Sequence, residues 1–163
     1  MSMMADDGKV SVLFVCLGNI CRSPMAEAVF RDLVKKANLA DKFEIKSAGT
    51  GGWHAGERVH RGTREILSRH GIDINGLVAK QVSPNDLEQA DYIIAMDTEN
   101  LADLQHAYGT DTAKMSRLLD HASGLDAHDV PDPYYDGRFE LVYELCRIGS
   151  EGLLTHIRKE RAL

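Results

Sequence analysis

The residues best suited to chemistry lie in one short segment near the start of the chain. Cys16-Leu-Gly-Asn-Ile-Cys-Arg22 places an arginine soon after a cysteine. A thiolate is a strong nucleophile, and a guanidinium is a planar fork that binds two phosphoryl oxygens at once, which lysine cannot reproduce. A cysteine alone at this place would more often be a buried structural residue. The pair instead predicts covalent phosphoryl transfer.

The residues around this segment predict a cradle for an anion. An apolar, β-branched run over 10–15 indicates a buried strand, and Ser23-Pro24 indicates a helix start, with Ser23 as N-cap. A loop that leads into a helix N-terminus turns several backbone N–H groups toward one point, where the helix dipole favours an anion or a thiolate. Gly18 and Asn19 suit its tight turns. We therefore expect the following residues to form a phosphate-binding loop around Cys16: Leu17, Gly18, Asn19, Ile20, Cys21 and Ser23.

The rest of the chain alternates strand and helix patterns. Further strands are expected over 43–47, 92–96 and 114–118, and helices over 24–37, 59–70, 84–89, 98–108 and 139–159. This order predicts an α/β fold, a parallel sheet with helices on both faces in a Rossmann-like three-layer arrangement. Residues 120–137, rich in proline and aspartate, are expected to form a long loop. We expect a flexible lead over 1–9 and a single domain over 10–163.

The composition of the chain limits the kinds of partner and location that can be expected. The net charge of −6 argues against nucleic acid or an anionic membrane as the main partner, because both favour a basic face. No apolar run approaches the roughly 20 residues of a membrane span. The three cysteines are too few for a disulfide framework, which favours a reducing, cytoplasmic location. The histidines have no ligand spacing, so neither a metal nor a cofactor is expected.

Two motifs resemble those of a known family. CLGNICRSPMAE is similar to the signature of the low-molecular-weight protein tyrosine phosphatases, and DPYYDG is similar to their acid loop. The resemblance covers about residues 10–158. It implies a four-stranded parallel sheet of the phosphotyrosine protein phosphatase I type. It also implies hydrolysis of phosphotyrosine through a phosphocysteine without a metal. Tyrosine-phosphorylated proteins would be the substrates, and phosphate or similar oxyanions the inhibitors.

The resemblance assigns the general acid to Asp132, which follows Pro131 in the second motif. Such an acid is needed because the departing phenolate must be protonated. An Asp-Pro pair alone would be interpreted as a turn. The neighbouring Asp129 and Asp136 remain rivals at this stage.

The resemblance also implies walls and supports for the site. Tyr134 and Tyr135 would flank the mouth and stack on an aromatic substrate, and Trp53 would form the opposite wall. Three residues match positions that hold the loop and orient a hydroxyl toward the thiolate: Asn19, Ser23 and Ser47.

One feature of the family pattern is missing. A histidine that often contacts the loop asparagine has no counterpart near Leu77, in the segment 76–81. The resemblance further implies that Cys21 is a redox partner, forming a reversible disulfide with Cys16 that protects the nucleophile. An inert small core residue is the equal alternative for Cys21.

Three other functions can be weighed. An arsenate reductase needs further cysteines, and none lies between Cys21 and Cys146. A phosphoarginine phosphatase of the same family typically has threonine where this chain has Ile20. A silent anion-binding module would be expected to lose Cys16, Arg22 or Asp132, and all are present.

Overall fold

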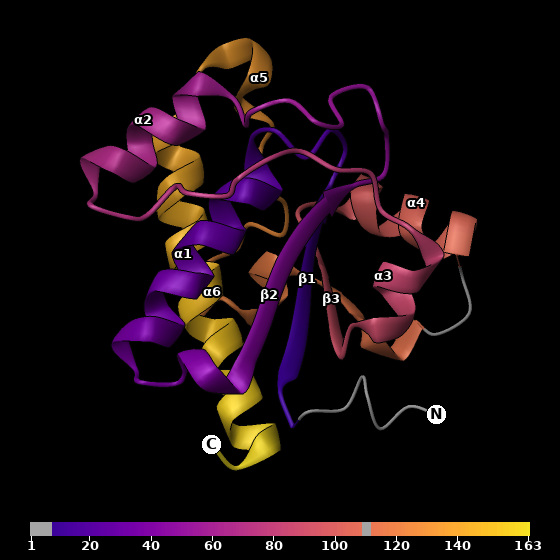
Figure 1. The fold of residues 1–163 in the computed structure, drawn as a ribbon, viewed down its shortest axis with the longest axis vertical. Coiled ribbons are helices and arrows are strands. Elements are labelled where there is room, and N and C mark those ends of the chain that lie inside the picture. The colour runs from indigo at the N-terminus through magenta and orange to yellow at the C-terminus, as the bar shows by residue number, and fades with distance from the viewer. Residues whose placement is uncertain (1–7, 109–111) are drawn as a thin grey trace.

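The computed structural model describes residues 8–108 and 112–163. The flexible lead expected over 1–9 therefore lies almost entirely outside the described residues. Four parallel strands form one sheet in the order β2-β1-β3-β4 (Figure 1). The strands are β1 (Val10–Cys16), β2 (Phe43–Gly49), β3 (Tyr92–Ala95) and β4 (Met115–Arg117). The predicted fold class, with helices packed around a parallel sheet, is confirmed.

Helices cover both faces of this sheet (Figure 1). The α-helices are α1 (Arg22–Lys36), α2 (Arg61–Arg69), α3 (Pro84–Gln89), α4 (Thr98–Tyr108), α5 (Pro133–Asp136) and α6 (Phe139–Arg161). Short 3-10 helices lie at Ala40–Lys42, Thr112–Lys114 and Leu118–His121. Within the two described ranges, no helix is long and apolar enough to cross a membrane.

The central strand β1 divides the core into two layers. Successive side chains of a strand point to opposite faces. Val12 and Phe14 accordingly join the cluster beneath α1 and α6, whereas Leu13 and Val15 join the cluster formed with α3 and α4. Because both faces of β1 are buried from Val12 onward, this part of the strand is apolar, and its carboxyl end places Cys16 at the edge of the sheet.

Two helix starts differ from the prediction. Ser23 was expected to be the N-cap of α1, but that helix begins at Arg22, and Cys21 is its N-cap without a side-chain bond. The Ser23 hydroxyl is instead turned toward Cys16. Helix α2 begins at Arg61 rather than at residue 59, because the backbone of His60 is not helical and its ring nitrogen Nδ1 accepts a hydrogen bond from the Gly62 N–H.

The expectation of an unbroken loop over 120–137 was wrong in part. The 3-10 helix Leu118–His121 overlaps its start, and α5 lies near its end. Asp132 caps α5 through its carboxylate, Pro133 occupies the first helical position, and Gly137 ends the helix with a φ of 73°. The residues that favour a turn here also favour a capped short helix, and periodicity cannot detect a helix of one turn.

Gly49, at the end of β2, allows two backbone segments to approach closely. A Cβ atom at Gly49 would lie 2.8 Å from the carbonyl oxygen of Leu17 and 3.0 Å from the carbonyl carbon of Gly18. The Gly49 N–H also donates to the carbonyl of Lys80, at 2.8 Å. Only a residue without a side chain fits between these segments, so Gly49 sets how closely β2 packs against the loop after β1.

We predict that Gly49→Ala lowers the free energy of unfolding by about 2–3 kcal/mol, because the new methyl group meets backbone that cannot move aside cheaply. Gly52→Ala is a matched control in the same loop, since its Cβ would meet only the movable tip of Gln81. Urea unfolding of the two variants should separate them. Equal stability of both would contradict this role for Gly49.

Candidate active site

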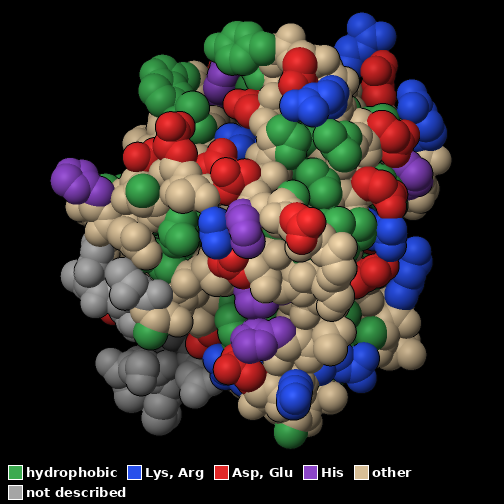
Figure 2. Space-filling view, turned by 180° about the vertical axis from the view of Figure 1, so that it is seen from behind, with side chains coloured by type: hydrophobic (Ala, Val, Ile, Leu, Met, Phe, Trp, Pro, Cys, Tyr) green, Lys and Arg blue, Asp and Glu red, His purple; other side chains and the backbone are tan. Residues whose placement is uncertain are grey.

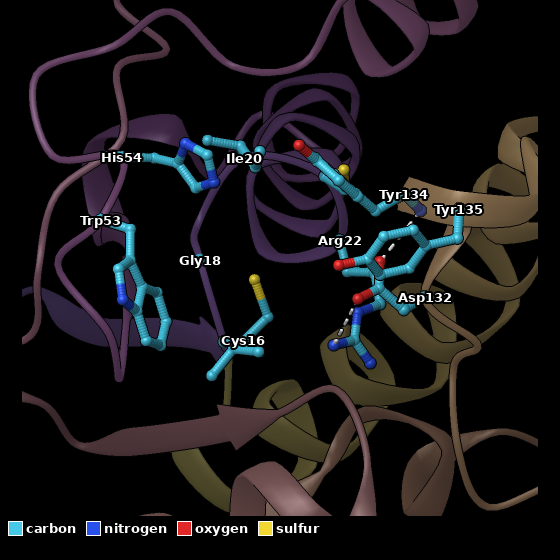
Figure 3. A pocket seen from close by; sticks show the side chains of 11 residues that line it. Cys16, Gly18, Ile20, Arg22, Trp53, His54, Asp132, Tyr134 and Tyr135 are labelled. Carbon is cyan, nitrogen blue, oxygen red and sulfur yellow. Dashed lines mark hydrogen bonds and ion pairs between the residues drawn. The ribbon is translucent and has the colours of Figure 1, made fainter.

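A pocket of about 300 Å³ opens at the carboxyl end of β1 (Figure 3). Cys16 lies at its floor, Trp53 and His54 on one side, and Asp132 with Tyr135 on the other. Its lining consists of Cys16, Leu17, Gly18, Ile20, Cys21, Arg22, Trp53, His54, Asp132, Tyr134 and Tyr135. The sequence-predicted nucleophile, arginine, acid and walls therefore share one cavity.

The Cys16 sulfur receives polar contacts from its own loop. The backbone N–H of Asn19 donates to Cys16 Sγ at 3.3 Å, and the Ser23 hydroxyl lies 2.9 Å from the same atom. Asn19 has the left-handed φ of 57° that the tight turn requires, as its residue type suggested. The sulfur is therefore in contact with polar groups at the start and at the end of its own loop.

The Asn19 side chain holds the loop in shape. Its Nδ2 group donates to Ser23 Oγ at 2.8 Å and to Ser47 Oγ at 3.0 Å. Ser23 Oγ therefore bridges the Asn19 amide and the Cys16 sulfur. Asn19 is fully buried, and this network satisfies its amide completely, since its oxygen also has a donor.

That donor replaces the missing histidine. The backbone N–H of Lys80 donates to Asn19 Oδ1 at 2.8 Å. On the other side of the network, the Ser47 hydroxyl donates to Glu27 Oε1 at 2.5 Å, and Glu27 is itself paired with Arg31. The Asn19 side chain, which lacks the histidine contact of the family pattern, is thus supported by the Lys80 backbone and, through Ser47, by the Glu27 carboxylate on α1.

Arg22 is buried, with 4% of its side chain exposed, and its charge is paired within the protein. Its Nη1 donates to Asp97 Oδ2 at 2.5 Å and to the carbonyl of Val130 at 3.0 Å. The other carboxylate oxygen of Asp97 accepts from the Asn100 N–H at 2.7 Å and so caps α4. Burial lowers the pKa of Arg22, but Cys16, Asp97 and Asp132 together outweigh it and raise the pKa. The guanidinium therefore stays charged.

Asp132 lies beside this arginine at the pocket mouth. Its Oδ1 accepts from the Tyr134 N–H at 3.0 Å, and its Oδ2 is 3.8 Å from Arg22 Nη2. The two rival carboxylates lie outside the pocket lining: Asp129 binds Thr98, and Asp136 binds Arg138. Of the three aspartates, Asp132 is the one that faces Cys16 (Figure 3).

The pocket walls are aromatic and largely exposed. Trp53 is 70% exposed and Tyr135 is 91% exposed, whereas the Tyr134 ring packs edge-on against His60 at 5.6 Å. His60 in turn stacks on Phe139 at 4.9 Å. Viewed from behind, hydrophobic side chains gather at the top of the molecule, the end at which α5 lies in Figure 1 (Figure 2). The walls thus form an apolar rim above a charged floor.

The other two thiols differ from Cys16. Burial, followed by the charges of Asp132 and Cys16, raises the pKa of Cys21 to about 12 against the opposing effect of Arg22. Burial also raises the pKa of Cys146 to about 12. Both therefore remain neutral thiols at physiological pH. All three cysteines are free in this structure.

Several functional residues were missed by sequence reasoning. Asp97 had a usable signal, because it lies two residues after β3 and parallel strands end at the same edge of a sheet. His54, Glu27 and the backbone of Lys80 had none, since their contacts depend on tertiary packing. Among the described residues, no group of three or more histidine, cysteine, aspartate or glutamate side chains could hold a metal ion.

Comparison with known proteins agrees with this geometry. A profile of the low molecular weight phosphotyrosine protein phosphatase family matches residues 11–163. The chain belongs to this family.

Its relatives include the low molecular weight protein-tyrosine-phosphatase YfkJ of Bacillus subtilis. That protein is 56% identical over 155 residues, which cover 94% of this chain and 99% of YfkJ. The crystal structure of YfkJ superposes with a TM-score of 0.91 at 54% identity and covers 95% of this chain and 98% of that one. The protein-tyrosine-phosphatase PtpA of Staphylococcus haemolyticus is 42% identical and covers 94% of this chain and 97% of PtpA.

A fly phosphatase in the same fold group bears on the alternative substrate. The crystal structure of the Drosophila arginine phosphatase has a TM-score of 0.82 at 34% identity and covers 90% of this chain and 97% of that one. A structure described as an arginine phosphatase thus shares the fold of this chain.

We predict that removing the Asn19 side chain destabilises the phosphatase. Asn19→Gly should lower the free energy of unfolding by about 2–4 kcal/mol, because the Lys80 N–H, Ser23 and Ser47 lose a buried partner. Asn19→Ala should cost about 1 kcal/mol more, because alanine is strained at a left-handed φ. Denaturant titration of both variants checks the order. A variant as stable as the wild-type protein would show that the network contributes nothing.

Proposed function

We propose that this phosphatase hydrolyses phosphotyrosine through a covalent intermediate on Cys16. The observation that carries the proposal is the floor of the pocket, where the Cys16 sulfur contacts the Asn19 N–H and the Ser23 hydroxyl beside the buried Arg22. Cys16 is the cysteine whose sulfur contacts both the Asn19 N–H and the Ser23 hydroxyl, whereas Cys21 and Cys146 have raised pKa values that keep their thiols neutral.

In the first step, the Cys16 thiolate attacks phosphorus in line with the departing phenolic oxygen. A sulfur–phosphorus bond forms as the phosphorus–oxygen bond breaks, and Asp132 gives its proton to the leaving oxygen. The hydrogen bonds of Arg22 to the described residues all come from Nη1, so Nε and Nη2 remain to bind the phosphoryl oxygens. Backbone N–H groups at the start of α1 stabilise the charge that develops.

In the second step, water attacks the phosphocysteine. Asp132, now a carboxylate, takes the proton from this water as the sulfur–phosphorus bond breaks. Inorganic phosphate leaves, and the Cys16 thiolate is regenerated. The protons and bonds therefore balance over the cycle, with one carboxyl group acting in both directions.

The rim supports an aromatic substrate displayed on a protein. Trp53, Tyr134 and Tyr135 offer ring faces at the mouth, and Ile20 adds an apolar contact within the pocket. Because these walls are exposed, a phosphotyrosine that projects from a protein surface could reach the floor. Phosphoarginine is the second candidate, on the strength of the Drosophila neighbour. Ile20, where the arginine-specific relatives typically have threonine, favours the aryl ester.

The test is turnover of p-nitrophenyl phosphate, phosphotyrosine and phosphoarginine by the reduced wild-type protein. Cys16→Ser should abolish turnover, and Asp132→Ala should lower kcat on phosphotyrosine by roughly 10²–10⁴-fold. The pH–rate profile should be bell-shaped with a mildly acidic optimum, because a thiolate and a protonated acid are needed together.

The outcomes separate the alternatives. Preference for phosphoarginine would retain the nucleophile and overturn the substrate, and Ile20→Thr would then be expected to raise that preference further. Turnover that survives in Cys16→Ser would overturn the mechanism. No turnover by a folded, reduced sample would make the protein an anion-binding module.

A further inference from the structure

The segment that precedes Asp132 is attached to the rest of the protein at few points. Residues 123–131 have no regular secondary structure, and most of their side chains are exposed. The hydrogen bonds that link them to other segments come from Asp129 and Val130. Besides the packing of Leu125 and Val130 against the core, the hydrogen bonds of Asp129 and Val130 hold Asp132 on one side and the α5 cap holds it on the other.

Asp129 is held by the amino end of α4. Its Oδ1 accepts from the backbone N–H of Thr98 at 2.8 Å and from the Thr98 hydroxyl at 2.7 Å. Thr98 is the first residue of that helix, where the N–H groups lack helical partners and a carboxylate is favoured. This contact joins residues far apart in the chain and fixes the backbone three residues before Asp132.

Arg117 extends the contact to β4. Its Nη1 donates to Thr98 Oγ1 at 2.9 Å, and its Nε and Nη2 bind both oxygens of Asp120. Because Thr98 Oγ1 accepts from Arg117, its single hydrogen is directed to Asp129. The Arg117 guanidinium thus donates to the Thr98 hydroxyl, which donates to the Asp129 carboxylate. Because one of these two hydrogen bonds has a charged donor and the other a charged acceptor, both are strengthened.

The contact also lies beside the partners of Arg22. The Met96 carbonyl accepts from the Val130 N–H at 2.9 Å, Asp97 pairs with Arg22, and Thr98 binds Asp129. Three consecutive residues after β3 thus hold both the arginine and the segment that carries the acid. A fixed relation between Arg22 and Asp132 is what in-line transfer with protonation requires.

We propose that Thr98, oriented by Arg117, is a positioning residue that holds Asp129 and thereby sets Asp132 for protonation of the leaving group. The proposal rests on the function assigned to Asp132 above. Thr98 does not line the pocket, so it acts on the reaction through the acid and not by contact with the substrate. Its loss should therefore matter for leaving groups that need a proton and should not matter for those that leave unaided.

The test compares kcat/KM for phenyl phosphate, a poor leaving group, with kcat/KM for 2,4-dinitrophenyl phosphate, a good one. This parameter reports the step that forms the phosphocysteine and is independent of its hydrolysis. Thr98→Val, which removes only the hydroxyl, should lower the value for phenyl phosphate about fivefold and leave the other within about twofold. Thr98→Ser, which keeps the hydroxyl, should have the same ratio of the two kcat/KM values as the wild-type protein.

Asp132→Ala is the reference variant. It should also lower kcat/KM for phenyl phosphate relative to 2,4-dinitrophenyl phosphate, by a larger factor than Thr98→Val. In the double variant, Thr98→Val should add nothing to this change, because its effect passes through Asp132. If Asp132→Ala changes the ratio but a folded Thr98→Val does not, the positioning role is overturned and the acid stands. If Asp132→Ala leaves the ratio unchanged, both assignments fall. Arg117→Met, expected to shift the ratio about threefold, serves the same test if Thr98→Val does not fold.

Discussion

The pairing of the buried Arg22 guanidinium with Asp97 and with the Val130 carbonyl determines how the rest of the site is arranged. A charge with only 4% of its side chain exposed is costly to bury unless the protein pairs it. Asp97, just after β3, supplies the countercharge. The carbonyl of Val130, two residues before Asp132, supplies a hydrogen-bond acceptor. Because its hydrogen-bond partners come from different segments, Arg22 brings together the start of α1, the start of α4 and the residues before Asp132.

The same charge resolves the conflict between a chain of net charge −6 and an anionic substrate. In the proposed mechanism, the pocket binds a phosphoryl group by a local arrangement, namely one paired arginine and the N–H groups at a helix start, rather than by the field of the whole protein. Asn19 completes this arrangement. Its left-handed backbone turns an N–H toward Cys16, and its amide fixes the hydroxyl that faces the sulfur.

Much of this could be predicted from the sequence, because local patterns carry it. The buried strand before Cys16, the helix after Arg22 and the alternation of elements determine the sheet and its reactive edge. What could not be predicted depends on distant partners. The Lys80 N–H that binds Asn19 has no sequence signature, since every residue except proline carries such a donor. The error over Ser23 has the same origin, because a serine before a helix suits a cap unless a buried sulfur competes for its hydroxyl.

The proposed mechanism requires that Cys16 forms a bond to phosphorus. A rapid-quench experiment with an aryl phosphate, followed by mass spectrometry of the denatured protein, tests it directly. We expect an early burst of phenol equal to the amount of enzyme, with the phosphoryl group on the peptide that contains Cys16. Turnover in which Cys16 never carries phosphorus, or in which another residue carries it, would show that Cys16 is not the nucleophile.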